Sequence, residues 1–154
     1  MAGFHNRFIR GAVLCSLVFS LLVSCDKTSG GDEYKPVPYM EWGAGMPAVK
    51  AYMSRYTLEK EDADNLYYKG WDKQKSISYH FEDGGLITSL VMFRSDSMEK
   101  SAIDAMMGGY ENIGEFDGAQ IYVSDELDAV GTVETVLSGG VSYYAVGWTR
   151  KSVE

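Results

Sequence analysis

His80 is the only histidine after residue 25, and its imidazole is the side chain of this chain best suited to proton transfer. A Ser–His–Asp arrangement could use it, because serine and aspartate residues are plentiful. However, the alternation of residues around His80 places its side chain on the wetter face of a strand. No G-x-S-x-G pattern surrounds any serine. We therefore interpret His80 as a solvated or hydrogen-bonded surface residue and predict no catalytic residue.

A cluster of carboxylates between residues 59 and 64 could attract calcium through its oxygen atoms. Its members are Glu59, Glu61, Asp62 and Asp64. The spacing does not meet the EF-hand pattern. The run Asp62–Asn65 is instead typical of a turn, because Asp and Asn side chains bond to their own backbone. We predict no metal site and no cofactor.

Two further loops carry contrasting side chains. Asp125–Asp128 is acidic, and it corresponds by an offset of 54 positions to Trp71–Gln74. Two equivalent loops could form one binding edge, and a pair of ordinary exposed turns is the favoured alternative.

The first 24 residues have the pattern of a secretion signal. Arg7 and Arg10 precede an apolar run from Gly11 to Val23. The run has about 13 residues, whereas a membrane-spanning helix needs roughly 20. The alternatives are an uncleaved anchor helix and an ordinary signal peptide, although an A-x-A-like cleavage site is absent.

The four residues Leu22–Cys25 resemble the lipobox of bacterial lipoproteins. This resemblance implies cleavage before Cys25 and attachment of a lipid to its sulfur, so that the membrane becomes a partner of the chain. It also implies a location in the cell envelope. We favour the outer membrane or cell surface, and the inner membrane stays open as an alternative.

Cysteine content and net charge argue against several kinds of site and partner in the mature chain. The only other cysteine, Cys15, lies inside the predicted signal, so no disulfide, catalytic thiol or cysteine zinc site is expected after cleavage. The full chain has 14 basic and 22 acidic residues; loss of Arg7 and Arg10 leaves 12 basic residues and a net charge of −10. Such a domain repels nucleic acid, so we predict no nucleic-acid partner.

After a tether over residues 25–41, we expect a single α+β domain over residues 42–154. Sliding the sequence by 54 positions aligns two repeats, about 46–94 and 98–149. Each repeat is expected to hold one helix and a four-stranded antiparallel meander, and the meanders to form a curved sheet with the helices on one face. The expected strands are 56–61, 66–69, 76–82, 86–93, 111–116, 119–124, 131–137 and 141–149.

Three segments suggest a wider likeness: Trp42–Gly45, leading into Val49–Met53, and then Tyr79–Leu86. With the repeats, they resemble the tandem-repeat fold of β-lactamase inhibitory protein and of small Bacteroidetes lipoproteins. The resemblance covers roughly residues 42–149 and implies an architecture alone. That inhibitor uses disulfides and a helix pair per repeat, which this chain lacks, so no inhibitory residue and no β-lactamase binding is carried over.

Aromatic and branched side chains suggest an interaction surface. In the last strand of each repeat both alternating faces carry bulky residues, although helices should cover only one. We therefore predict an open face that binds a protein, with a homodimer as one alternative. The candidate residues are Val91, Phe93, Tyr143, Trp148 and Trp71. The competing interpretation is that Tyr39, Trp42 and other tether aromatics cover this face.

The predicted function is therefore a non-enzymatic, lipid-anchored protein-interaction module of the cell envelope. The alternative is a small-ligand or glycan binder, in which Trp42, Trp71 or Trp148 stacks on a sugar ring. A hydrolase whose acidic residues are not identified is a third and weaker hypothesis.

Overall fold

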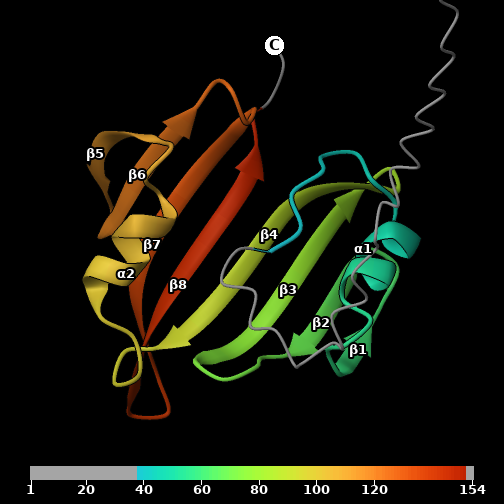
Figure 1. The fold of residues 1–154 in the computed structure, drawn as a ribbon, viewed down its shortest axis with the longest axis horizontal. Helices are drawn as coiled ribbons and strands as arrows, with labels where there is room; N and C mark the ends of the chain where they lie inside the picture. Colours follow the sequence, from blue (N-terminus) through green and yellow to red (C-terminus); the bar gives the residue numbers. More distant parts are fainter. Residues whose placement is uncertain (1–37, 152–154) are drawn as a thin grey trace, which may run out of the picture. The chain divides into compact units, whose positions relative to one another are not determined.

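The computed structural model describes residues 38–151, and one antiparallel sheet dominates this part of the chain (Figure 1). Eight strands pair in the order β1-β2-β3-β4-β8-β7-β6-β5, so β4 and β8 meet at the centre. The elements are α1 (Met46–Tyr52), β1 (Leu58–Glu61), β2 (Asn65–Lys69), β3 (Gln74–Glu82), β4 (Gly85–Arg94), α2 (Lys100–Met106), β5 (Glu111–Phe116), β6 (Ala119–Ser124), β7 (Ala129–Ser138) and β8 (Val141–Arg150).

The predicted signal peptide, Cys25 and most of the predicted tether lie outside the described residues. Neither helix within residues 38–151 has the length and hydrophobicity that crossing a membrane requires.

The predicted fold class, α+β with a tandem repeat of one helix plus a four-stranded meander, is wrong. The chain is mostly an eight-stranded antiparallel sheet and is only 12% helical, with two helices of seven residues each. The apolar spacing that predicts a helix through Tyr56 continues past the end of α1, so Met53 and Tyr56 are buried from the turn that follows. Each helix buries a single residue, Val49 or Ile103.

The predicted start of the second helix is also wrong. The spacing of Asp96 and Glu99 predicts a capping box, but α2 begins at Lys100, and its N-cap residue Glu99 makes no side-chain capping bond. Asp96 instead accepts hydrogen bonds from Arg94 and Ser97. The Asp96 side chain, which the pattern predicts to cap the helix, is therefore held in an ion pair with Arg94.

The core lies between the sheet and the two helices. Side chains on one face of the sheet are buried in register across five strands: Tyr68, Ile77, Val91, Val146 and Val133. One hydrophobic cluster joins this row to Val49 of α1 and Ile103 of α2. Both helices therefore pack on the same face of the sheet.

Residues 38–45, the strap, cross this helix face between the two helices. The Ser89 hydroxyl donates to the Tyr39 carbonyl at 2.7 Å, and the Tyr39 N–H donates to the Tyr79 phenol oxygen at 3.3 Å. The Trp42 indole donates to the Leu127 carbonyl at 3.0 Å. These contacts fasten the strap to both halves of the sheet.

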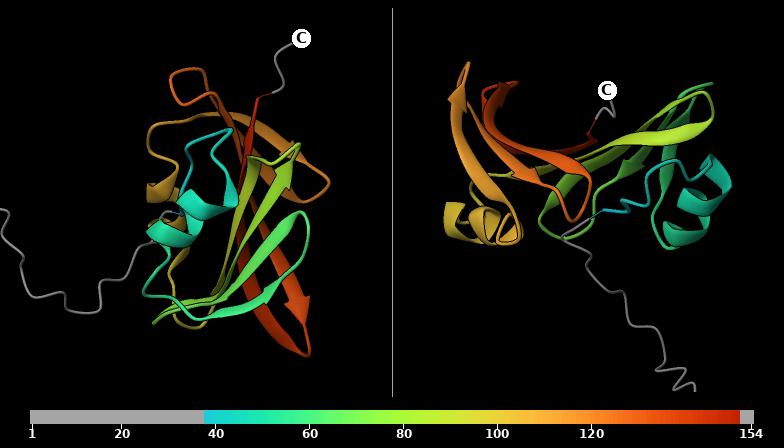
Figure 2. Two further views of the ribbon diagram at one scale, coloured as in Figure 1. Left: turned by 90° about the vertical axis from the view of Figure 1, so that its right-hand side faces the viewer. Right: turned by 90° about the horizontal axis from the view of Figure 1, so that it is seen from above.

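The opposite face, which we call the open face, has no helix or strap against it in the described residues. Figure 2 shows α1, α2 and the strap together on the other side of the sheet. Tyr39 and Trp42 belong to the strap on the helix face, so the interpretation that they cover the open face is wrong.

Candidate binding face of the sheet

The pairing register identifies which side chains project from the open face. One row runs across six strands: Tyr67, Ser78, Leu90, Gly147, Thr132 and Ile121. The next row holds Asn65, His80, Thr88, Thr149, Val130 and Val123. His80 therefore lies on the face away from the core, as the alternation around it predicts.

The open face divides into two chemically different parts. On β2, β3 and β4 the polar half has Asn65, Ser78, His80 and Thr88, with Tyr67 and Leu90 among them. On β5, β6 and β7 the apolar half consists of Phe116, Ile121, Val123, Val130 and Val136. Phe116 is 78% exposed, and the other four apolar side chains are partly exposed.

Charged side chains project from both halves of the open face. Lys60, Lys69 and Glu82 lie beside the polar half. Glu111 borders the apolar half, and Glu134 lies within it, between Val130 and Val136 on β7. The Lys60 ammonium lies 5.1 Å from the centre of the Tyr67 ring, which is a cation–π distance.

A shallow hollow of about 320 Å³ indents the polar half. Its lining comes from three adjacent strands and consists of Asn65, Tyr67, Ser78, Tyr79, His80, Thr88 and Leu90. Thr88 shares a hydrogen bond of 3.3 Å with Thr149 on β8. The lining contains hydroxyl, amide and imidazole groups but no carboxylate, lysine or arginine.

A chain of three side chains fixes the His80 ring. The Asn65 amide nitrogen donates to Asp62 Oδ1 at 2.8 Å, and the Asn65 amide oxygen lies 2.8 Å from His80 Nδ1. The hydrogen bond from Asn65, together with the backbone N–H of Asp64, lowers the pKa of Asp62. The carboxylate therefore stays ionised, and it holds Asn65 in its orientation, until the pH falls below the usual range for aspartate.

This orientation selects one tautomer of His80. Because the amide nitrogen of Asn65 faces a carboxylate, its oxygen must face the ring, so His80 Nδ1 carries the proton and donates. In the neutral ring, Nε2 is then an acceptor. No described hydroxyl hydrogen-bonds to it.

We expect long-range ¹H–¹⁵N correlation spectra of the neutral ring to show His80 protonated at Nδ1. The variant Asn65→Ala should lose this preference, because it removes the acceptor that faces Nδ1. A native ring protonated at Nε2 would contradict the assigned hydrogen-bond chain.

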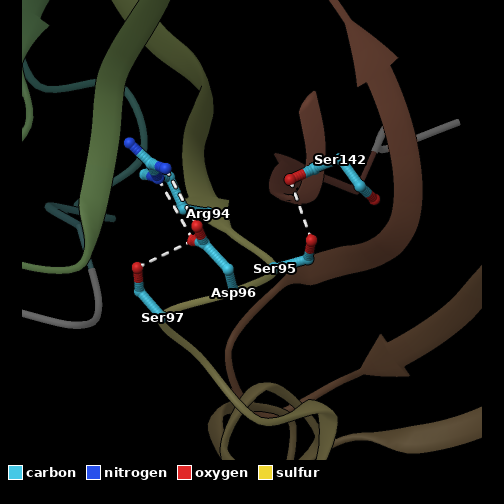
Figure 3. Close-up of polar contacts among 5 residues, drawn as sticks. All are labelled: Arg94, Ser95, Asp96, Ser97 and Ser142. Atoms are coloured by element: carbon cyan, nitrogen blue, oxygen red, sulfur yellow. Dashed lines mark hydrogen bonds and ion pairs between the residues drawn. The ribbon is translucent and has the colours of Figure 1, made fainter. Parts of the chain in front are cut away.

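Polar contacts fix the connection from β4 to α2 (Figure 3). Arg94 donates to both carboxylate oxygens of Asp96, at 3.1 and 2.9 Å, and Ser97 donates to the same carboxylate at 3.0 Å. This ion pair raises the pKa of Arg94 and lowers that of Asp96. Ser95 donates through its hydroxyl, at 2.9 Å, and its N–H to the Ser142 carbonyl on β8. These contacts fix the chain reversal beside Tyr143, which pairs with Arg94 across the strands.

The structure places most of the predicted surface residues elsewhere. Val91, Phe93 and Trp148 are fully buried in the core, so assigning them to an open surface is wrong. Trp71 is partly buried and packs edge-on against Tyr56, with ring centres 6.1 Å apart. Tyr143 alone projects from the open face, where it neighbours Val136.

Glu61 and Asp62, two of the four acidic residues around the β1–β2 turn, bond to neighbouring side chains. Glu61 pairs with Lys50 of α1 at 2.6 Å, and Asp62 bonds Asn65 and lies 3.6 Å from Lys60. Within residues 38–151 no three histidine, cysteine or acidic side chains are grouped as a metal site would require.

The second acidic loop does not form a shared binding edge with its counterpart. Asp125 pairs with Lys151 and Asp128 with Arg150 at 3.3 Å. The antiparallel order places the β6–β7 turn and the β2–β3 turn, which holds Trp71, at opposite ends of the strands. The less favoured alternative, one binding edge formed by these two loops, is therefore wrong.

Sequence reasoning missed the neighbours of His80 in the hollow, above all Tyr67 and Thr88. A partial signal is the alternation of Ser76, Ser78 and His80 with buried apolar residues on β3. It indicates the wet face of one strand, but not which residues of β2 and β4 join that face.

No known protein family, curated protein sequence or solved structure matches this chain. The resemblance to bacterial lipoproteins and to β-lactamase inhibitory protein is therefore not tested by these comparisons. Any function has to be argued from the chain's own residues.

Proposed function

We propose that this chain is a lipid-anchored protein of the bacterial cell envelope that binds a protein partner through the apolar half of its open face. The lipid anchor rests on the sequence pattern that ends at Cys25. The binding face rests on the arrangement of β5, β6 and β7.

The observation that carries the proposal is an apolar surface with nothing packed on it in residues 38–151. Ile121, Val123 and Val130 lie side by side on β6 and β7, partly exposed, and Phe116 extends the patch to the edge of the sheet. Contiguous exposed apolar patches of this kind mark interaction sites, because their burial by a partner is favourable.

The acidic residues of the apolar half indicate which charges the partner's surface should carry. Glu111 borders the apolar half, Glu134 lies within it between Val130 and Val136, and the chain has a net charge of −8. A partner with an apolar patch bordered by lysine or arginine would complement both features.

The arrangement around His80 supports binding in preference to catalysis. Nucleophilic catalysis needs a hydroxyl or thiol within hydrogen-bond reach of its base. In the described residues His80 bonds Asn65, and neither Ser78 nor Thr88 bonds its ring.

The proposal predicts that Phe116→Ser reduces capture of the partner at least about tenfold, as expected for an exposed aromatic anchor. The measurement is a quantitative pull-down of the lipidated full chain from the native envelope in mild detergent. Self-association that Phe116→Ser abolishes would support the proposal equally, with a second copy as the partner.

Leu137→Ser is the matched control, because Leu137 is 74% exposed but projects from the opposite side of β7 to Val136. It should change capture by less than about twofold. Cys25→Ala should abolish the incorporation of a labelled fatty acid into the chain. Equal capture by Phe116→Ser and Leu137→Ser would overturn the binding face, and a native chain that incorporates no labelled fatty acid would overturn the anchor.

A further inference from the structure

We propose that the hollow in the polar half of the open face binds one ring of a neutral, polyhydroxylated ligand, that is, a glycan residue. This site is separate from the apolar half and goes beyond the proposed protein partner. The proposal is argued from the residues that line the hollow.

The size of the hollow suits one sugar ring. Ligand sites generally measure about 300–1,000 Å³, so a hollow of about 320 Å³ lies at the small end of that range. Its shallow form leaves one side of the ligand open to solvent, where the remainder of a glycan chain would continue.

The lining offers both kinds of hydrogen bond that a sugar hydroxyl needs. His80 Nε2 is an acceptor, because Asn65 holds the proton on Nδ1. The hydroxyls of Ser78 and Thr88 can each donate and accept. Sugar hydroxyls likewise donate and accept, so adjacent hydroxyls of one ring can bond His80 and its two neighbours together.

Apolar groups complete the site. Tyr67 and Leu90 line the hollow beside the polar groups and can contact the C–H groups of a sugar ring. None of the three tryptophans takes this role. Trp148 is in the core, Trp42 belongs to the strap, and Trp71 packs against Tyr56. The proposed site therefore uses Tyr67, whereas the alternative drawn from the sequence used a tryptophan.

Two other ligand classes fit less well. A charged ligand would find no carboxylate, lysine or arginine side chain in the lining of the hollow to pair with. An extended peptide would need a free strand edge, but β2, β3 and β4 are each paired on both sides. Recognition therefore depends on side chains alone, which suits a compact ring.

Saturation-transfer NMR on the lipidated full chain, in a detergent without a sugar headgroup, tests the site. The probes are the methyl glycosides of glucose, galactose, mannose and N-acetylglucosamine. We expect at least one probe to bind saturably and to shift the His80 ring resonances. The absence of saturable binding by every probe at about 50 mM, far above a millimolar Kd, would overturn the proposal.

A matched pair of substitutions locates the site. Ser78→Leu should fill the hollow and weaken binding at least about tenfold. Ser76→Leu makes the same change two residues away on the same face of β3, outside the lining, and should change affinity by less than about twofold. Equal effects of the two variants would contradict the assigned position.

Thr88→Val provides a variant of nearly unchanged shape. Loss of one hydroxyl should weaken binding about fivefold, and unchanged affinity would count against the site. Phe116→Ser should leave sugar binding unaltered, and Ser78→Leu should leave capture of the protein partner unaltered. Failure of the glycan site is thereby distinguishable from failure of the proposed protein-binding function.

Discussion

Replacement of Trp148 by alanine is expected to lower the free energy of unfolding by about 3–5 kcal/mol. Trp148 is 0% exposed and lies on β8 between Ser89 and Gly131, near the centre of the sheet. Its removal would leave a large cavity under the strap. Few surrounding groups can move to fill it, because paired strands flank the position on both sides.

Urea unfolding followed by far-ultraviolet circular dichroism measures the loss. Tyr143→Ala is the control, since Tyr143 is on the same strand but projects from the open face. It should cost only about 1 kcal/mol. If the two substitutions cost the same, Trp148 does not lie in the core as the structure places it.

This pair of residues also shows why the sequence alone misplaced the surface. Strand positions were predictable, because alternation and turn residues mark each strand; β5 and β6 begin and end at the expected residues. The buried side of a strand was not predictable for β4 and β8, where both alternating sets are bulky. In β4, Val91 and Leu90 have similar hydrophobicity, and only the position of the helices decides that Val91 is buried.

The fold class failed for a related reason. Apolar residues that recur every three or four positions predict one continuous helix. The same pattern also fits a short helix followed by a turn, as at Val49, Met53 and Tyr56. Helices of two turns gain little stability of their own. The architecture therefore depends on strand pairing, above all on the pairing of β4 with β8 at the centre of the sheet.

The hollow was predictable only in part. The alternation on β3 indicated that His80 faces away from the core, and the register confirms it. Its neighbours depend on which residue of β4 pairs with His80. An irregularity between His80 and Phe81 sets that register, placing Thr88 opposite His80 and Leu86 opposite Phe81. Such an irregularity leaves one residue of β4 without a partner on β3, and no pattern in a single sequence predicts where this occurs.

The turn between β2 and β3 gives the second large expected effect, through Gly70. A Cβ at this position would lie 2.5 Å from the carbonyl carbon of Gln74 and 2.7 Å from that of Lys75. Both neighbours are backbone atoms, and the Gly70 N–H donates to the Lys75 carbonyl at 3.2 Å. Gly70→Ala therefore has to open the turn and displace the buried Gln74. We expect it to lower the free energy of unfolding by about 3 kcal/mol or more.

Gly109→Ala is the matched control, because a Cβ at Gly109 would meet nothing within 4 Å. Where the backbone tolerates it, replacing glycine by alanine stabilises a protein by about 0.4–1 kcal/mol, since it restricts the unfolded chain. The same urea measurement should therefore separate the two variants, with Gly70→Ala less stable and Gly109→Ala equal to or more stable than the native chain. A Gly70→Ala chain as stable as Gly109→Ala would mean that the start of β3 does not approach Gly70 this closely. The register that places Ser78 and His80 on the open face would then need revision, because it begins at this turn.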